Sequence, residues 1–211
     1  FAINYEFGFR YQNSDSGTLL EAIGFISDYS NLVGQCTFSS GCTVEDLDQQ
    51  FNGGDAFIAG VELVAEHIFS LPKGFQMPLR ASYTYTHATF ESSFVSSNPQ
   101  FGAVADGDFL PYVAPHQAAV SLGVTHSLWS LNLGVTYIDR MRETAGGDDV
   151  PKTDAAWLLD ASVSYSPLDW LDLYVTGENI ANQQVIASRR PFGARPIRPL
   201  QLMGGLRLRY N

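Results

Sequence analysis

The chain has 211 residues, of which 45% are hydrophobic and 13% aromatic, and its net charge is −10. The aromatic content argues against a disordered chain, and the excess of acid argues against a nucleic-acid partner, which would require a basic face. No stretch approaches the roughly 18 consecutive apolar residues of a membrane-spanning helix. A helical membrane protein is therefore excluded, but a membrane protein of another kind is not.

A two-residue periodicity runs through the chain, and helical periodicity is nearly absent. In residues 79–86, Leu, Ala and two Tyr side chains share one face, whereas Arg, Ser and two Thr side chains share the other. This alternation is typical of strands with one apolar and one polar face. It predicts strands at about 2–12, 18–30, 56–69, 76–92, 115–126, 129–142, 155–166, 169–179 and 199–210. The second strand is the least regular, because Leu19 and Leu20 leave its facing ambiguous.

The connections between these strands alternate in length. The short ones cover 12–17, 70–75, 126–128 and 166–168, and the long ones cover 31–55, 93–114, 143–154 and 180–198. Outer-membrane barrels combine short periplasmic turns with long extracellular loops, and the strands are long enough for a tilted bilayer crossing. We therefore predict an all-β, antiparallel transmembrane β-barrel with apolar side chains facing lipid. A soluble antiparallel sandwich with one wet face would also explain the alternation alone.

The chain opens at Phe1 within an alternating segment, without an initiator Met or a signal peptide. Single-chain bacterial barrels have even strand numbers, so we expect the strands to form the C-terminal arc of a larger barrel, of about 22 strands. The last segment, 206–211, resembles the final strand of outer-membrane proteins, although its aromatic residue, Tyr210, is penultimate.

Two cysteines, Cys36 and Cys42, lie in a stretch rich in Gly and Ser. Because the four His residues are scattered elsewhere, this pair does not indicate a metal or catalytic site. We predict a disulfide that closes a short loop, which implies an oxidising compartment. Two free thiols are the alternative.

Five segments, taken in order, resemble the C-terminal half of a TonB-dependent outer-membrane receptor. Residues 52–63 contain a Gly-Val-Glu core, 110–117 contain a Pro-rich lead into a strand, and 177–183 contain a Glu-Asn turn. Residues 189–196 contain Gly-Ala-Arg-Pro ahead of the last strand. With 137–147, the sequence is most similar to the ferric citrate (iron dicitrate) receptor subgroup.

The resemblance implies that residues 1–211 are the C-terminal part of a receptor β-barrel domain, whose plug domain and N-terminal box lie outside this chain. It also implies active, TonB-energised uptake of a ferric chelate (a siderophore) across the outer membrane of a Gram-negative cell. The expected partners are the ferric chelate, the lipid bilayer with its lipopolysaccharide, the plug domain and the TonB complex. No resident cofactor is expected.

Arginine supplies 10 of the 12 basic residues, and eight of these lie from Arg140 onward. Ferric chelates such as dicitrate are anionic, and a guanidinium binds a carboxylate in bidentate fashion. The residues expected to bind ligand in the extracellular loops are Arg140, Arg142, Arg189, Arg190 and Arg195. Alternatively, these side chains pair with lipopolysaccharide phosphates or with Asp148, Asp149 or Asp154. Arg207 and Arg209 are expected to face the lumen and to pair with Glu62, Glu66 or a plug.

The remaining motifs do not indicate a metal or catalytic site. Residues 146–149 read Gly-Gly-Asp-Asp, but they lack the oxygen spacing of a calcium loop and indicate a flexible acidic loop. His116, next to Pro115, is expected to start a strand rather than bind a metal. Because no nucleophile or paired-carboxylate motif is found, we expect neither an enzyme nor a metal site. A passive porin-like channel and a surface barrel that binds a protein partner remain alternative functions.

Overall fold

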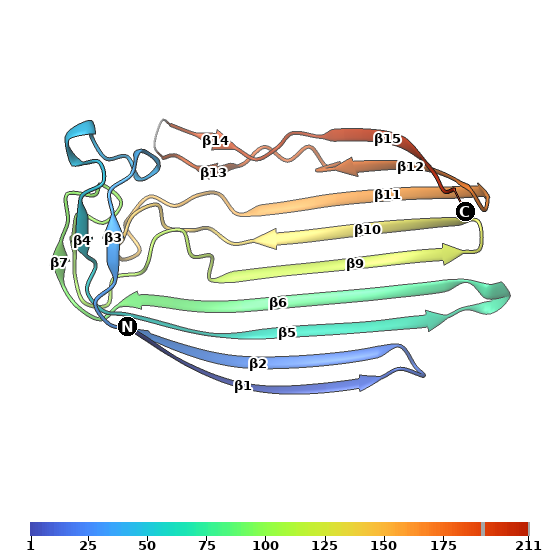
Figure 1. The fold of residues 1–211 in the computed structure, drawn as a ribbon, viewed down its shortest axis with the longest axis horizontal. Coiled ribbons are helices and arrows are strands. Elements are labelled where there is room, and N and C mark those ends of the chain that lie inside the picture. Colours follow the sequence, from blue (N-terminus) through green and yellow to red (C-terminus); the bar gives the residue numbers. More distant parts are fainter. Residues whose placement is uncertain (191–192, 211) are drawn as a thin grey trace.

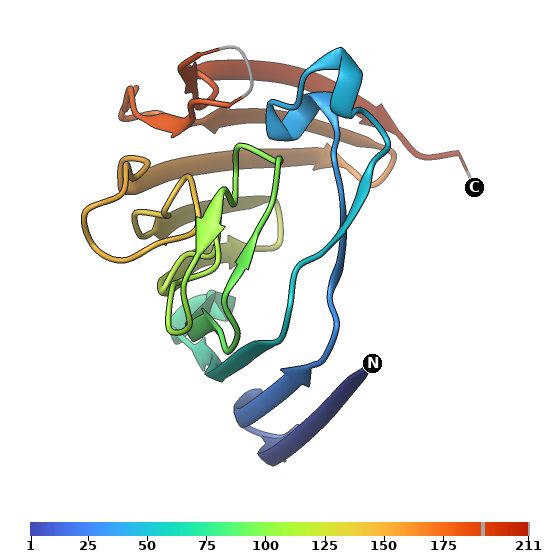
Figure 2. The same cartoon turned by 90° about the vertical axis from the view of Figure 1, so that its left-hand side faces the viewer.

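The computed structural model describes residues 1–190 and 193–210; Pro191 and Phe192 of the Gly-Ala-Arg-Pro segment, and the final Asn211, lie outside the described residues. Nine strands form one antiparallel sheet in which each strand pairs with the next long strand of the chain. They are β1 (Ala2–Asn13), β2 (Thr18–Tyr29), β5 (Ala56–Ser70), β6 (Gln76–Phe90), β9 (His116–His126), β10 (Trp129–Ile138), β11 (Ala156–Leu168), β12 (Leu171–Glu178) and β15 (Gln201–Leu208). All nine predicted strands are thus confirmed. Figure 1 shows them side by side, and Figure 2 shows that the sheet curves into an arc.

The strand register separates a polar face from an apolar one. On the polar face, Arg10 lies opposite Glu21 and Arg80 lies opposite Glu66, with charged atoms 3.6 and 2.9 Å apart. The other face leaves large apolar side chains open, such as Phe7, which is 83% exposed. Soluble proteins rarely expose a continuous apolar surface of this kind, whereas the wall of a membrane barrel requires it.

The short connections lie at one end of the sheet and the long loops at the other, as the sequence predicts. One end carries tight turns, including the turn that contains η3 (Pro72–Gly74). In the first turn, Gly17 has a φ of +60°, and a Cβ there would lie 3.1 Å from the Cβ of Ile68. Only glycine combines this backbone conformation with such a close approach. Within the described ranges, no helix is long and apolar enough to cross a bilayer.

The long loops at the other end contain short elements that the sequence did not predict. They are β3 (Val33–Gln35) paired with β4 (Gln50–Asn52), β7 (Phe94–Val95) paired with β8 (Ala103–Val104), β13 (Ile186–Ser188) paired with β14 (Arg195–Pro196), η1 (Phe38–Ser40) and η2 (Val44–Asp46). Figure 2 shows the loop of residues 30–55 leaving β2 and crossing the open side of the arc toward the β13–β14 hairpin.

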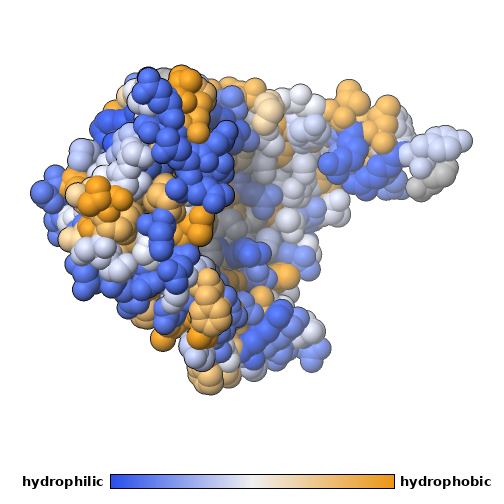
Figure 3. Space-filling view, turned by 60° about the vertical axis from the view of Figure 1, so that its left-hand side comes forward, coloured by the Kyte–Doolittle hydropathy of each residue, from blue (hydrophilic) through white to orange (hydrophobic). Residues whose placement is uncertain are grey.

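These loops pack around an apolar core of their own. Ala56, Phe90, Val104 and Ala145 are buried together, with Phe94 and Phe101 packed against them. The rings of Phe90 and Phe94 have centroids 5.3 Å apart, in an edge-to-face arrangement favourable for aromatic pairs. The outer surface of this loop end is mostly hydrophilic, with scattered apolar patches (Figure 3). The loops therefore form a packed layer, not a set of independent flexible segments.

Candidate ligand-binding site between the long loops

A cavity of about 510 Å³ lies where three of the long loops meet. The first loop supplies Gly34, Gln35, Thr37, Ser39, Ser40 and Phe51; the second supplies Asn98, Gln100, Phe101 and Tyr112; the last supplies Ala187, Ser188, Arg190 and Arg195. Two of these residues are cationic and none of those described is acidic. In a chain of net charge −10, this combination of guanidinium, amide, hydroxyl and aromatic groups suits an anion.

The first loop reaches the cavity through a tip closed by a disulfide between Cys36 and Cys42, whose Cα atoms are 5.8 Å apart. Both cysteines are buried. Inside the tip, the backbone N–H of Ser40 donates to Thr37 Oγ1 at 3.3 Å, and the N–H of Thr37 donates to Ser40 Oγ at 3.2 Å. This capping box orders η1, so that Thr37 and Ser40 face the cavity from a fixed segment.

Arg190 and Arg195 belong to the β13–β14 hairpin, in which Ser188 pairs with Arg195. Within the hairpin, the N–H of Arg190 donates to Ser188 Oγ at 3.2 Å. The hairpin and the disulfide tip lie close together, since a Cβ added to Gly41 would lie 3.5 Å from Arg190 Nη1. Two of the five predicted arginines therefore meet at one cavity.

Arg142 has a structural role. It is buried, its Nε donates to the carbonyl of Gly147 at 2.8 Å, and its Nη2 donates to Asp148 at 2.8 Å. Its guanidinium carbon also lies 3.7 Å from the centroid of the Phe109 ring, a cation–π contact. Arg142 thus makes the pair with Asp148 that the sequence left open, and it does not line the cavity.

Asp148 also accepts a hydrogen bond from Lys152 Nζ at 2.9 Å. This hydrogen bond, together with the charges of Lys152 and Arg142, lowers the pKa of Asp148 below its ordinary value. The expected flexible acidic loop is thus tied together by its own ion pairs. Among the described residues, His, Cys, Asp and Glu form no group of three that could hold a metal ion.

The other two predicted arginines lie away from the cavity lining. Arg189 Nη1 donates to the carboxylate of Glu143 and, at 2.8 Å, to the carbonyl of Lys152. It therefore fastens the β13–β14 hairpin to residues 139–154. Arg140 is exposed, and its backbone N–H donates to Asp139 at 2.8 Å. Ligand contact by Arg140 stays a prediction.

At the opposite end of the sheet, the expected pairing of Arg209 with Glu62 or Glu66 is wrong, whereas a pairing of Arg207 or Arg209 with a plug stays a prediction. Arg209 Nη2 lies 2.6 Å from Asp172 Oδ2 on the adjacent strand, and Glu66 instead pairs with Arg80. Both pairs join neighbouring strands, so a cross-strand partner was available for each charge without reaching across the sheet. His116 begins β9, as expected, and its Nδ1 lies 2.8 Å from the hydroxyl of Tyr83.

Tyr112 lines the cavity but is not among the ligand-binding residues that the sequence predicts, because it lies within a Pro-rich segment. Its hydroxyl lies 3.1 Å from Ser188 Oγ, which joins the second loop to the last one. Its φ is +56°, although bulky residues seldom adopt the left-handed region. An aromatic residue directly after a proline in a loop was the one sequence signal that pointed to it.

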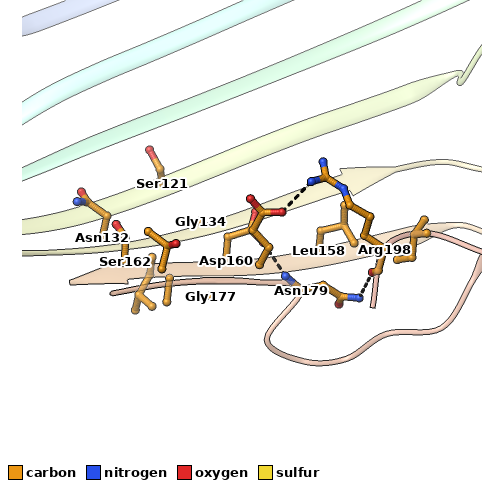
Figure 4. A pocket seen from close by; sticks show the side chains of 14 residues that line it. Ser121, Asn132, Gly134, Leu158, Asp160, Ser162, Gly177, Asn179 and Arg198 are labelled. Carbon is orange, nitrogen blue, oxygen red and sulfur yellow. Dashed lines mark hydrogen bonds and ion pairs between the residues drawn. The ribbon is translucent and has the colours of Figure 1, made fainter. Parts of the chain in front are cut away.

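A second hollow, of about 710 Å³, follows the polar face of the sheet and includes Asp160, Glu178, Asn179 and Arg198 (Figure 4). Here Arg198 Nη1 lies 3.0 Å from Glu178 Oε2, and the N–H of Asn179 donates to Asp160 at 2.9 Å. Its single cation is therefore already paired and is outnumbered by carboxylates. This hollow is less suited to an anion than the cavity between the loops.

Among curated proteins, none matches the chain, but solved structures do. The ferric-catecholate import receptor Fiu of E. coli K12, in its closed form, has a TM-score of 0.69 at 20% identity, over 98% of this chain and 27% of its own. The ferric citrate transporter FecA, in its unliganded form, has a TM-score of 0.71 at 19% identity, over 98% of this chain and 31% of its own. The copper transporter OprC has a TM-score of 0.70 at 16% identity, also over 98% of this chain and 31% of its own.

This chain thus spans under a third of each of these proteins, and identities this low show a shared fold alone. The family evidence is separate, because a family model described as "TonB dependent receptor-like, beta-barrel" matches residues 1–180. That match covers most of the chain, including eight of the nine strands of the sheet. The chain belongs to the TonB-dependent receptor-like β-barrel family.

Proposed function

We propose that the chain is part of an outer-membrane receptor that takes up a ferric chelate, with uptake energised through TonB. The observation that carries this proposal is the cavity between the long loops, which presents Arg190 and Arg195 but no described acidic residue. A ferric citrate-type ligand fits this chemistry, because its carboxylates accept bidentate hydrogen bonds from guanidinium groups. The names of the similar structures, two ferric receptors among them, support iron uptake.

In this proposal the long loops are extracellular and capture the chelate. The apolar face of the sheet contacts lipid and lipopolysaccharide, and the polar face lines the path that a plug domain closes. TonB supplies the energy by acting on the plug from the periplasmic side. The packed apolar core beneath the loops supports a preorganised capture site, which loses less conformational entropy on binding than a flexible one.

The test is growth with ferric dicitrate as the sole iron source, in strains with and without the gene. Deletion should abolish growth, and so should loss of TonB. The R190A/R195A double variant should lower uptake at limiting chelate at least tenfold, since each guanidinium–anion hydrogen bond contributes about 1.5–3 kcal/mol.

The control is R207A, which removes one positive charge from β15 at the opposite end of the sheet and should leave uptake near the wild-type level. Uptake that persists without TonB would instead support a passive channel. If deletion changed uptake of no ferric chelate, the receptor function would be wrong, and a surface barrel that binds a protein partner would gain support.

A further inference from the structure

Tyr112 occupies a backbone conformation that its side chain disfavours. Its φ of +56° lies in the left-handed region, where a bulky residue is an outlier that persists only when its surroundings impose it. Such residues concentrate at ligand-binding sites, where strain holds a side chain in one direction. In this chain the strained residue is aromatic and lines the cavity between the loops.

The surroundings that impose this conformation are themselves fixed. The N–H of Tyr112 donates to the carbonyl of Arg142 at 2.8 Å. Arg142 is in turn held by Asp148, Gly147 and the ring of Phe109. A buried arginine whose side chain is held at Nε and Nη2 therefore supports the strained residue.

The hydrogen bonds around Ser188 have two arrangements, one of which leaves the phenol proton available. Ser188 Oγ accepts the N–H of Arg190 at 3.2 Å, lies 3.3 Å from the carbonyl oxygen of Arg190 and lies 3.1 Å from the Tyr112 hydroxyl. Ser188 has one proton, which either the Arg190 carbonyl or the phenol oxygen accepts. When the phenol oxygen accepts it, the Tyr112 proton is free for another acceptor. A ligand oxygen in the cavity would supply that acceptor.

The cavity then offers three side-chain donors around one space: the phenol of Tyr112 and the guanidinium groups of Arg190 and Arg195. We propose that Tyr112 contacts the ligand and, with these two arginines, selects a chelate that is anionic and rich in oxygen acceptors. Carboxylate and phenolate oxygens share this chemistry. The inference rests on the proposed function and names the class of ligand and the neutral donor that recognises it.

The experiment measures chelate affinity in native outer membranes that contain the complete receptor carrying this chain. The probes are ferric dicitrate and a ferric tris-catecholate, each at low and high salt, and they distinguish carboxylate from phenolate ligands.

Y112F keeps the ring but removes the hydroxyl, and it should bind the preferred chelate about tenfold more weakly. Its salt dependence should match the wild type, because no charge is lost, whereas R190A should also flatten the salt dependence. Y83F, which removes a hydroxyl bound to His116 outside the cavity, should behave as wild type.

Three results would overturn the proposed contact between Tyr112 and the ligand. Wild-type affinity in Y112F, in a receptor that binds either chelate, overturns the role of Tyr112 and leaves the proposed function standing. A Y112F variant that loses affinity and salt dependence together shows that Tyr112 only holds the arginine hairpin, which also overturns ligand contact. A wild-type receptor that binds neither anionic chelate overturns the proposed function and this inference with it.

Discussion

Arg189 and Glu143 lie 46 residues apart in the sequence, and the contact between them joins two loops. Nη1 of the arginine donates to the glutamate carboxylate, and the glutamate side chain is only 6% exposed. The same nitrogen donates to the carbonyl of Lys152. A nearly buried carboxylate requires a partner of this kind, because an unpaired charge in such a place is costly. This side chain therefore helps to anchor the β13–β14 hairpin, which carries the cavity arginines, to residues 139–154. Two hydrogen bonds between Asp154 and Ile186 join the same segments.

We predict that R189A loosens both segments. The substitution leaves the Glu143 carboxylate without its cation, which should lower the free energy of local opening by about 1–3 kcal/mol. Hydrogen exchange of backbone amides in 139–154 and 186–190 measures this change. The control is R198A, which breaks a pair between more exposed side chains and should cost under about 1 kcal/mol. Equal protection in R189A and wild type would contradict the anchor.

A second prediction concerns the disulfide between Cys36 and Cys42. Breaking it frees a short closed segment, and the chain-entropy argument puts the local loss near 2 kcal/mol. Thr37 and Ser40 should then lose their fixed positions at the cavity, and the affinity for the chelate should fall in reducing buffer. The C36S/C42S variant should show the lowered affinity with or without reductant. If reductant weakened binding equally in that variant, the effect would have another origin.

The strands were predictable because their signal is local and repeated. Alternating side chains define a strand wherever it pairs, so the predicted bounds of eight of the nine strands lie within two residues of the observed ends. The exception is β10, which stops at Ile138 although alternation continues to Arg142. There the Asp139 side chain accepts the N–H of Arg140, and Arg142 packs on Phe109.

The binding site was only partly predictable, because its geometry depends on contacts between distant loops. The sequence shows that most arginines lie near the C-terminal end. It does not distinguish Arg142, which is buried and paired, from Arg190, which lines the cavity. The contact between Tyr112 and Ser188 spans 76 residues and follows no periodicity. The 3₁₀ helices η1 and η2 and the loop hairpins are likewise too short to be recognised from a two-residue pattern.

The third prediction is a pH dependence at residues 139–154. The pKa of Asp148 is lowered in the folded protein, first by the hydrogen bond from Lys152. A lowered pKa means that the ionised carboxylate stabilises the loop fully above the ordinary aspartate value, near 3.9, and loses this contribution as the pH falls through the lower folded value. Amide protection in 139–154, corrected for intrinsic exchange, should therefore be the same at pH 7 and 5 and fall below about pH 4. D148N should lack this step, and a step already present near pH 6 would assign the effect to another group.

The last prediction tests which face of the sheet contacts lipid, using two adjacent residues of β10. Leu133 lies opposite Ala161 on the apolar face, and Asn132 lies opposite Ser162 on the polar face. An arginine on the lipid face near the bilayer midplane costs about 2–4 kcal/mol, whereas a lumenal arginine is tolerated. L133R should therefore reduce the amount of folded receptor in the outer membrane, measured by the mobility shift of the barrel on heating. N132R adds the same side chain one position away and should fold to near the wild-type level. If N132R were the more damaging change, the apolar face would not be the one that meets lipid.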